Sequence, residues 1–294
     1  MGAPREPRRD AAVSDNVADD GVFETVRDGY DAVYDALAHS AVFNRIWRAN
    51  AYGGDFPEQF AHIGFLTLDE ARLLVELLAI DTGSVLIDVA CGAGGPGLWA
   101  ARQTGASLIG LDPAPAGVAA AQQRARRVGL QNRSRFEQAT FERTGLPTAT
   151  ADAMMSVEAF QYAPDKRAAL IELFRVLRPS GRLALICFEV DPARANGLPV
   201  LGVDPVPDYR PVLEETGFIV EIYEETPGWQ PRVDCAFGAI LDAKDQLTDE
   251  MGQPAAQAAI AEAMLTIQIK PYARRVLALA SRPAHTPIVA NRRW

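Results

Sequence analysis

The segment Val85–Gly97, VLIDVACGAGGPG, constrains the fold of this chain more than any other. A short apolar run, typical of a buried parallel strand, ends in small residues and passes directly into glycines. Glycines let backbone N–H groups come close to a ligand, and the N-terminus of a following helix favours negative charge. Gly92, Gly94 and Gly97 also match GxGxxG, a spacing typical of dinucleotide-binding turns. The segment therefore predicts a ligand site where a parallel strand meets a helix.

Strand-like and helix-like segments alternate through the middle of the chain. The apolar patterns predict strands at 84–90, 106–112, 134–140, 151–160, 181–190, 218–228 and 273–283. They predict helices at 92–105, 114–129, 165–179 and 208–217. The alternation indicates an α/β fold, a doubly wound, seven-stranded and mostly parallel sheet. The last two strands flank a helical insert and are expected to pair at one edge.

Composition divides the chain into five expected parts. These are a disordered tail at 1–20, an N-terminal helical cap rich in aromatic residues at 21–81, a ligand-binding core at 82–227, a helical insert or lid at 228–270, and a last strand with a tail at 271–294. Both helical parts flank the core in sequence. We therefore expect them to cover it together.

Charge and cysteine content restrict the class of partner. The chain of 294 residues carries a net charge of -9, so its overall field does not favour a nucleic-acid backbone, and a small-molecule partner is expected. No window reaches the ~18 apolar residues of a membrane span. Cys91, Cys187 and Cys235 are too widely spaced for a disulfide framework or a zinc site, which is typical of a cytoplasmic protein. No cluster of His, Asp and Glu indicates a metal.

Two aspartates accompany the glycine turn. Asp88 lies at the end of the first core strand, where it would repel a pyrophosphate but would suit a ligand that carries an ammonium and a sulfonium group. Asp112 ends the next strand, where its carboxylate can accept hydrogen bonds from both ribose hydroxyls. The turn alone leaves a nicotinamide-dependent oxidoreductase open as an alternative.

Four stretches together resemble the class I S-adenosylmethionine-dependent methyltransferases, in their small-molecule, natural-product branch. These stretches are VLIDVACGAGGPG, LIGLDPAP, MMSVEAFQYAPD and LFRVLRPSGRLALICFE. The resemblance implies a Rossmann-like methyltransferase fold with S-adenosylmethionine as the cofactor. It also implies methyl transfer to an oxygen, nitrogen or carbon atom of a small, hydrophobic metabolite. A cyclase or decarboxylase of the same fold, or a non-methylating binding protein, remains an alternative.

The resemblance also implies which residues contact the cofactor. Asp88 and the turn residues Ala90, Cys91, Gly92 and Gly94 would hold the methionine part, Asp112 the ribose, Pro113, Thr140 and Phe141 the adenine, and Val157 with Glu158 the methionine end. Thr140 stands where the family usually has an aspartate, and Ala90 where it usually has a glycine.

Three residues are candidates for the chemistry. His62, in the segment FAHIGF, is a candidate base, although a hydrogen-bonded loop histidine is the alternative. Tyr162 stands where relatives often carry a histidine, and it is expected either to orient the acceptor or to be a packed aromatic. Glu189 ends the fifth core strand and could bind or deprotonate an acceptor, or be a solvated loop acid.

Apolar residues of the insert have two possible roles. They could line an acceptor chamber, or they could form the core of a homodimer or of the helical cap. The residues concerned are Phe237, Ile240, Leu241, Met264 and Ile267.

Overall fold

The computed structural model describes residues 16–195, 197–198 and 204–284. Its centre is a seven-stranded sheet with the order β3-β2-β1-β4-β5-β7-β6, which confirms the predicted fold class. The strands are β1 (Val85–Val89), β2 (Ser107–Asp112), β3 (Ser134–Gln138), β4 (Ala151–Val157), β5 (Leu177–Val190), β6 (Ile219–Glu225) and β7 (Ala273–Ser281). β7 runs antiparallel to both β5 and β6, and the other pairs are parallel.

Alternate residues of the strands point to opposite faces of the sheet, and both faces are buried. Leu86 and Leu108, which are paired between β1 and β2, belong to one apolar cluster. Their neighbours Ile87 and Ile109 belong to the other. Burial on both sides explains why these strands read as continuous apolar runs rather than as alternating ones.

Helices cover the two faces. On one side lie α3 (Leu68–Leu78), α4 (Gly95–Thr104) and α5 (Pro115–Arg127), and on the other lie α6 (Lys166–Val176) and α8 (Arg210–Glu215), with the short α7 (Pro192–Ala195) after β5. A capping box of Thr67 and Glu70 begins α3. Although the predicted cap extends to residue 81, α3 packs against the sheet beside α4. The packing thus assigns α3 to the core.

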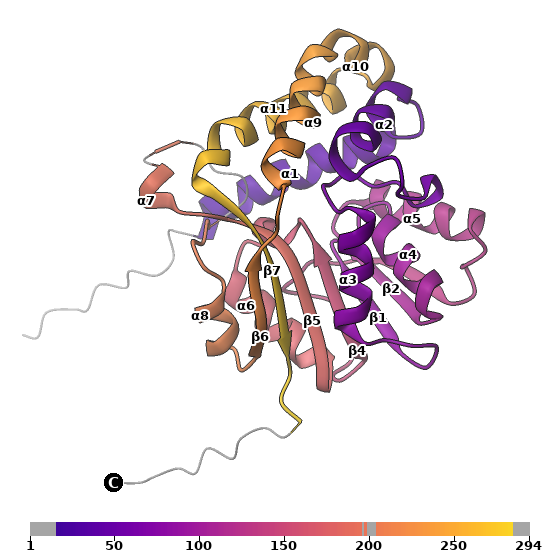
Figure 1. Ribbon diagram of the computed structural model, residues 1–294, viewed down its shortest axis with the longest axis vertical. Coiled ribbons are helices and arrows are strands. Elements are labelled where there is room, and N and C mark those ends of the chain that lie inside the picture. The colour runs from indigo at the N-terminus through magenta and orange to yellow at the C-terminus, as the bar shows by residue number, and fades with distance from the viewer. Residues whose placement is uncertain (1–15, 196, 199–203, 285–294) are drawn as a thin grey trace, which may run out of the picture.

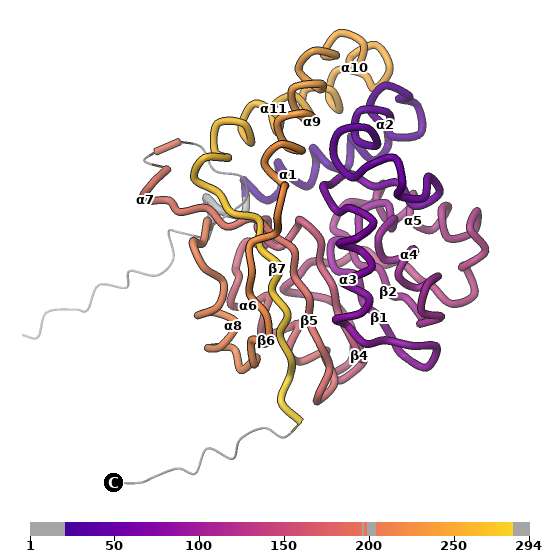
Figure 2. Tube along the Cα trace, in the orientation of Figure 1, coloured from indigo at the N-terminus to yellow at the C-terminus, as the bar shows by residue number. Residues whose placement is uncertain are grey.

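The remaining helices form a single layer above the carboxyl ends of the parallel strands (Figures 1 and 2). From the N-terminal part come α1 (Asn16–Ala36), α2 (Ala41–Trp47) and a π-helical turn η1 (Arg48–Tyr52), and from the insert come α9 (Trp229–Asp242), α10 (Lys244–Met251) and α11 (Gln253–Ile269). Short 3-10 turns are η2 (Glu58–Phe60), η3 (Phe160–Tyr162) and η4 (Lys270–Tyr272). α1 packs along α11 and also contacts α5. It begins at Asn16, inside the predicted tail, of which residues 1–15 lie outside the described residues.

The helix predicted at 165–179 ends early. α6 stops at Val176, and β5 begins at Leu177. Pro179 explains the difference, because a proline disfavours helical backbone in the residue before it. The stretch LRPSG therefore belongs to the strand.

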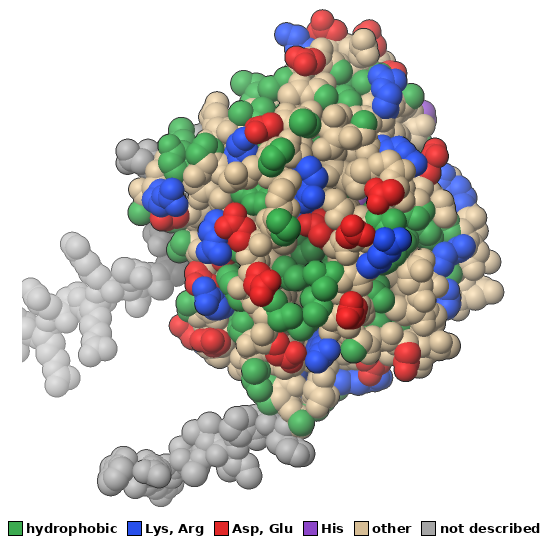
Figure 3. All heavy atoms as spheres, viewed as in Figure 1, with side chains coloured by type: hydrophobic (Ala, Val, Ile, Leu, Met, Phe, Trp, Pro, Cys, Tyr) green, Lys and Arg blue, Asp and Glu red, His purple; other side chains and the backbone are tan. Residues whose placement is uncertain are grey.

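The surface carries charges of both signs. Acidic and basic side chains are interspersed over the face shown in Figure 3, rather than gathered into a basic region. Among the described residues, no helix has the length and apolar character needed to span a bilayer.

Candidate active site

A cavity lies where the carboxyl ends of β1, β2, β3 and β4 meet α1. It encloses about 1040 Å³ of empty space, part of which is open to solvent. The structure brings nearly all the predicted cofactor residues to its wall: Asp88, Ala90, Cys91, Gly92, Asp112, Pro113, Thr140, Phe141, Val157 and Glu158. Gly94 is the exception. It is the N-cap residue of α4, with φ of 73°, and a Cβ there would lie 2.9 Å from the Ala121 side chain, so its role is in packing.

The glycine turn holds α1 close to the cavity. Gly92 has φ of 50°, and a Cβ there would lie 2.2 Å from the hydroxyl oxygen of Tyr34, a residue of α1. Glycine is therefore required at this position both by the left-handed backbone and by the close approach of the tyrosine. Ala90, which precedes it, also has a positive φ, of 58°. This conformation gives a physical reason for the glycine that is usual at the position.

Asp112 is buried at the end of β2. Its two oxygens accept hydrogen bonds from the backbone N–H groups of Gly92, at 2.7 Å, and Ala114, at 2.9 Å. Burial raises the pKa of Asp112 to about 6, although these hydrogen bonds lower it. A carboxylate offers about four lone-pair sites, so the group can still accept two further hydrogen bonds from a ligand.

Asp88 is buried beneath the start of α4. Its Oδ2 atom accepts no hydrogen bond from any described residue, and a Cβ at Gly97 would come within 2.5 Å of it. Burial, and next the charge of Asp112, raise the pKa of Asp88 to about 8. A cationic ligand would relieve both effects, so these residues fit the ammonium and sulfonium groups of S-adenosylmethionine.

α1 and α5 add residues that the sequence reasoning did not place in the site. Tyr30, Tyr34 and Arg124 all line the cavity. Arg124 donates to the Ala61 carbonyl at 2.5 Å, and burial lowers its pKa to about 10. The aromatic residues of α1 follow helical spacing in the sequence, but this pattern does not reveal which surface they face.

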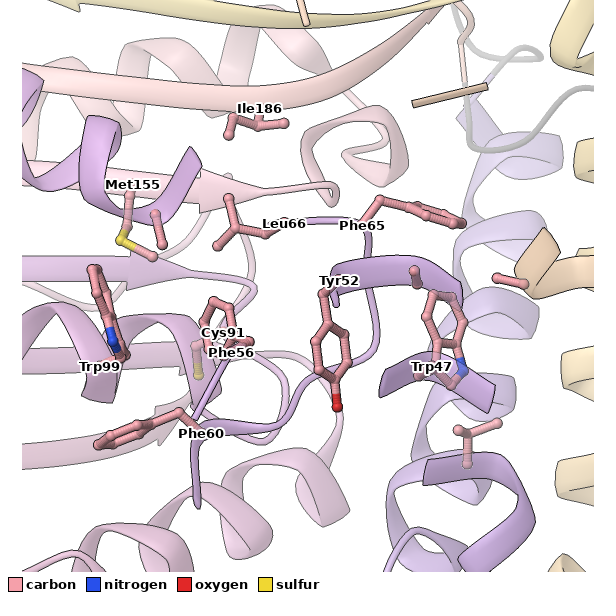
Figure 4. Close-up of a cluster of buried hydrophobic side chains, with 14 of the residues drawn as sticks. Trp47, Tyr52, Phe56, Phe60, Phe65, Leu66, Cys91, Trp99, Met155 and Ile186 are labelled. Atoms are coloured by element: carbon pink, nitrogen blue, oxygen red, sulfur yellow. The ribbon is translucent and has the colours of Figure 1, made fainter. Parts of the chain in front are cut away.

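His62 lines the cavity among aromatic side chains. Its ring stacks on Tyr52 with centroids 4.3 Å apart, and it meets Phe56 at 4.7 Å. Both ring nitrogens are buried and unpartnered among the described residues. Burial lowers the pKa of His62 to about 3, so the ring is neutral and accepts a proton poorly at physiological pH. Figure 4 shows Tyr52 and Phe56 in the surrounding apolar cluster.

Tyr162 lines the same cavity on the side that faces the insert. Its hydroxyl lies 3.3 Å from that of Tyr30 and donates to Glu262 Oε1 at 3.4 Å. Burial and the charge of Glu262 raise the pKa of Tyr162, so the phenol stays protonated and serves as a hydrogen-bond donor. Sequence reasoning missed Glu262, because nothing in the helical pattern of the insert distinguishes it from a solvated acid.

Glu189 does not reach the cavity, which corrects its proposed contact with an acceptor. The side chain is buried at 1 % exposure, where Tyr223 and the Tyr209 N–H donate to it and Arg274 pairs with it. Burial raises its pKa despite these contacts. Glu189 thus packs the segment before α8 against β5 and β6.

Glu158 lines the cavity, but its carboxylate is already occupied. Arg275, which is fully buried in β7, donates to Glu158 at 2.6 Å and to Glu70 at 2.6 Å. The Phe65 N–H donates to the other oxygen of Glu158 at 2.7 Å. Glu158 therefore ties the FAHIGF segment to the sheet, and its φ of 56° is held by these contacts.

Comparison with known proteins identifies the class. Residues 87–185 match the family described as "Methyltransferase domain". The 27-O-demethylrifamycin SV methyltransferase of Amycolatopsis mediterranei is 28% identical over 217 residues, which cover 68% of this chain and 78% of that protein. Residues 87–185 are therefore a methyltransferase domain of the class I, S-adenosylmethionine-dependent type. The domain uses S-adenosylmethionine as its cofactor.

Solved structures share the fold of this methyltransferase. The [4+2]-cyclase SpnF is 21% identical with a TM-score of 0.69, over 86% of this chain and 94% of that one. A geranyl diphosphate methyltransferase in complex with S-adenosylmethionine is 19% identical with a TM-score of 0.56, over 73% and 84% of the two chains. In the described part of the methyltransferase, no group of three or more His, Cys, Asp or Glu residues could hold a metal ion.

Proposed function

We propose that the acceptor is a small hydrophobic metabolite and that the cofactor binds in the cavity between Asp88 and Asp112. The observation that carries this assignment is the pair of buried carboxylates, neither of which forms an ion pair with a described residue. Ionising both acids in a ligand-free site is costly, because each charge would be desolvated and would lie near the other. A nucleoside that bears positive charge relieves both costs.

The roles of individual residues follow from their places on the wall. Asp112 accepts the ribose hydroxyls with its free lone pairs, and Asp88 with the turn at Ala90–Gly92 faces the charged methionine end. Thr140 and Phe141, after β3, lie beside the adenine with Pro113. His62 and Tyr162 are neutral at physiological pH, and they shape the cavity rather than remove a proton. The bound cofactor supplies the electrophilic methyl group.

A hydrophobic acceptor is supported by the walls around the site. Trp47, Phe65 and Phe237 form a buried aromatic cluster beside Tyr162, with ring centroids 5.4 to 5.9 Å apart. Phe237 also lines a second cavity, which supports an acceptor chamber there, whereas Met264 is 52% exposed. The first curated relative acts, by its name, on a rifamycin. The three free cysteines support a cytoplasmic setting.

Calorimetry of the full chain with S-adenosylmethionine and S-adenosylhomocysteine tests the cofactor site. Asp112→Ala should weaken binding of both at least tenfold, since it removes a carboxylate that two turn amides and the ribose share. Asp69→Ala, an exposed acid at the start of α3, is the matched control and should bind normally. Equal affinities of the two variants would contradict the assignment. A product mass that gains one methyl group distinguishes methylation from cyclisation, which leaves the mass unchanged.

A further inference from the structure

A second, smaller cavity adjoins the first beneath α11. It holds about 380 Å³ of empty space, part of which is open to solvent, and shares Tyr30, Ile63, Glu158 and Tyr162 with the wall of the cofactor cavity. The two cavities therefore adjoin at these four side chains.

Two polar side chains on the wall of this cavity lack a hydrogen-bond partner among the described residues. Trp47 Nε1 and Thr266 Oγ1 are buried, in residues that are 3% and 5% exposed, and neither makes a hydrogen bond within the described residues. An unsatisfied buried donor costs about 1–3 kcal/mol, so such groups are expected to meet a ligand or an ordered water. The two groups therefore indicate a site that binds a polar ligand or an ordered water.

The third polar group is Glu262, one helical turn before Thr266 on α11. Its Oε1 atom accepts a hydrogen bond from Tyr30 at 2.8 Å and from Tyr162 at 3.4 Å, while Oε2 accepts none from the described residues. The titratable groups around it are Tyr30 and Tyr34 of α1, Tyr162 of η3 and Glu158 after β4. No described basic side chain pairs with Glu262.

We propose that the second cavity is the acceptor subsite, that it takes an alcohol or phenol with an apolar body, and that Glu262 receives the hydroxyl proton. A hydroxyl can donate to the free oxygen of Glu262, while Trp47 and Thr266 can donate to other oxygens of the same ligand. The aromatic walls suit its apolar part. The inference rests on the cofactor assignment above and adds the class of acceptor.

The proposed step is an in-line O-methylation. The acceptor oxygen forms a bond to the methyl carbon as the carbon–sulfur bond breaks, and the electron pair of that bond stays on sulfur, which gives S-adenosylhomocysteine. The hydroxyl proton passes to Glu262 and then to solvent. Burial raises the pKa of Glu262 to about 7, despite the two tyrosine hydrogen bonds, which suits a general base near neutral pH.

Phenol is the probe for binding, and toluene is its isostere without a hydroxyl group. In the full chain saturated with S-adenosylhomocysteine, the indole N–H resonance of Trp47, assigned with Trp47→Phe, reports on the second cavity. Phenol should shift this resonance and toluene should not. Glu262→Gln and Thr266→Val should each weaken the binding of phenol at least threefold. Equal shifts from both compounds, or no shift from either, would overturn the subsite.

Methyl transfer from labelled S-adenosylmethionine to phenol, which gives anisole, tests the base. The wild-type rate should rise with pH through about 7, as Glu262 loses its proton. Glu262→Gln should lower the rate by at least about 100-fold, the scale of general base catalysis, and should abolish this rise. Met264→Gln, on the exposed face of the same helix, is the control and should match the wild type.

Two further results separate the possible failures. If phenol binds in the second cavity and wild-type enzyme forms no anisole, or Glu262→Gln keeps its rate, the role of Glu262 is overturned. If S-adenosylhomocysteine itself does not bind by calorimetry, the cofactor assignment fails instead. The isosteric Glu262→Gln variant should also have the unfolding temperature of the wild type. A loss of rate then reports on chemistry rather than on folding.

Discussion

At the scale of single residues, backbone conformation limits which side chain the glycine turn accepts. Ala90 has φ of 58°, in the left-handed region that costs a non-glycine residue about 1–2 kcal/mol. The carbonyl end of β1 and the turn hold it there. The residue therefore stores strain at the wall of the cofactor cavity.

Ala90→Gly should raise the free energy of unfolding by about 0.5–1 kcal/mol, because relief of the strain exceeds the added entropy of the unfolded chain. Urea denaturation measures the change. Ala119→Gly, at an exposed position within α5, is the control and should lower the free energy by about 1 kcal/mol. If both substitutions destabilise equally, Ala90 is not strained.

Asp88 and Asp112 should make the affinity for S-adenosylmethionine depend on pH. The pKa values of Asp88, about 8, and Asp112, about 6, lie above the usual range, so the ligand-free site holds protons that a cationic ligand displaces. Affinity for S-adenosylmethionine should therefore rise between pH 6 and 8.

Calorimetry in two buffers of different ionisation enthalpy measures the protons released. Close to one proton should be released per cofactor at pH 7, where Asp88 is mostly protonated. Asp88→Asn should abolish most of this release. An affinity that does not change with pH would show that neither acid meets the positive charge.

At the scale of elements, a buried network joins β7, α3 and the FAHIGF segment. Arg275 is enclosed in it, between Glu158 and Glu70, and Arg232 pairs with Glu70 at 3.3 Å. Removing one partner of a buried ion pair leaves the other charge uncompensated.

Arg275→Met should lower the free energy of unfolding by about 3–5 kcal/mol, because both glutamates then lose their buried partner. Thermal and urea denaturation measure the loss. Arg72→Met removes the exposed pair with Asp69 and should change stability by less than about 1 kcal/mol. Similar effects of the two substitutions would mean that the buried network contributes little.

The elements themselves were largely predictable from the sequence. The strands that end in Asp88 and Asp112 have apolar runs with clear boundaries, and their alternation with helices predicts a mostly parallel sheet. The end of α6 at Val176 was not predicted, because the expected helix was extended to Pro179 itself. A proline also disfavours helical backbone in the residue before it, so the helix ends earlier. α3 was expected in the cap, because amphipathic spacing reveals an apolar face but not its partner.

At the scale of the whole molecule, the layer above the sheet joins two distant parts of the chain. Glu262 meets Tyr30 and Tyr162 only because α11 packs along α1 over the strand ends. No local pattern contains this contact, which explains why the sequence points to His62, Tyr162 and Glu189, rather than Glu262, as candidates for the chemistry. The cofactor residues were easier to find, since they lie within a few residues of the strand ends.

Ligand binding should also reduce local opening in this helical layer. Tyr34 of α1 lies against Gly92, and the Ala116 N–H at the start of α5 donates to Asp31 of α1 at 2.7 Å. S-adenosylhomocysteine should therefore slow amide hydrogen exchange in α1 at least tenfold, because the ligand adds contacts to one face of the helix. The exposed α10 is the internal reference and should be unchanged. Unaltered exchange in α1 would show that the helix does not cover the ligand.

A crystal structure with S-adenosylhomocysteine tests the central claim most directly. The ribose should meet Asp112, the amino group should lie near Asp88, and the sulfur should face the wall formed by Tyr30 and Tyr162. A nucleoside bound elsewhere, or a sulfur atom directed away from the second cavity, would contradict it.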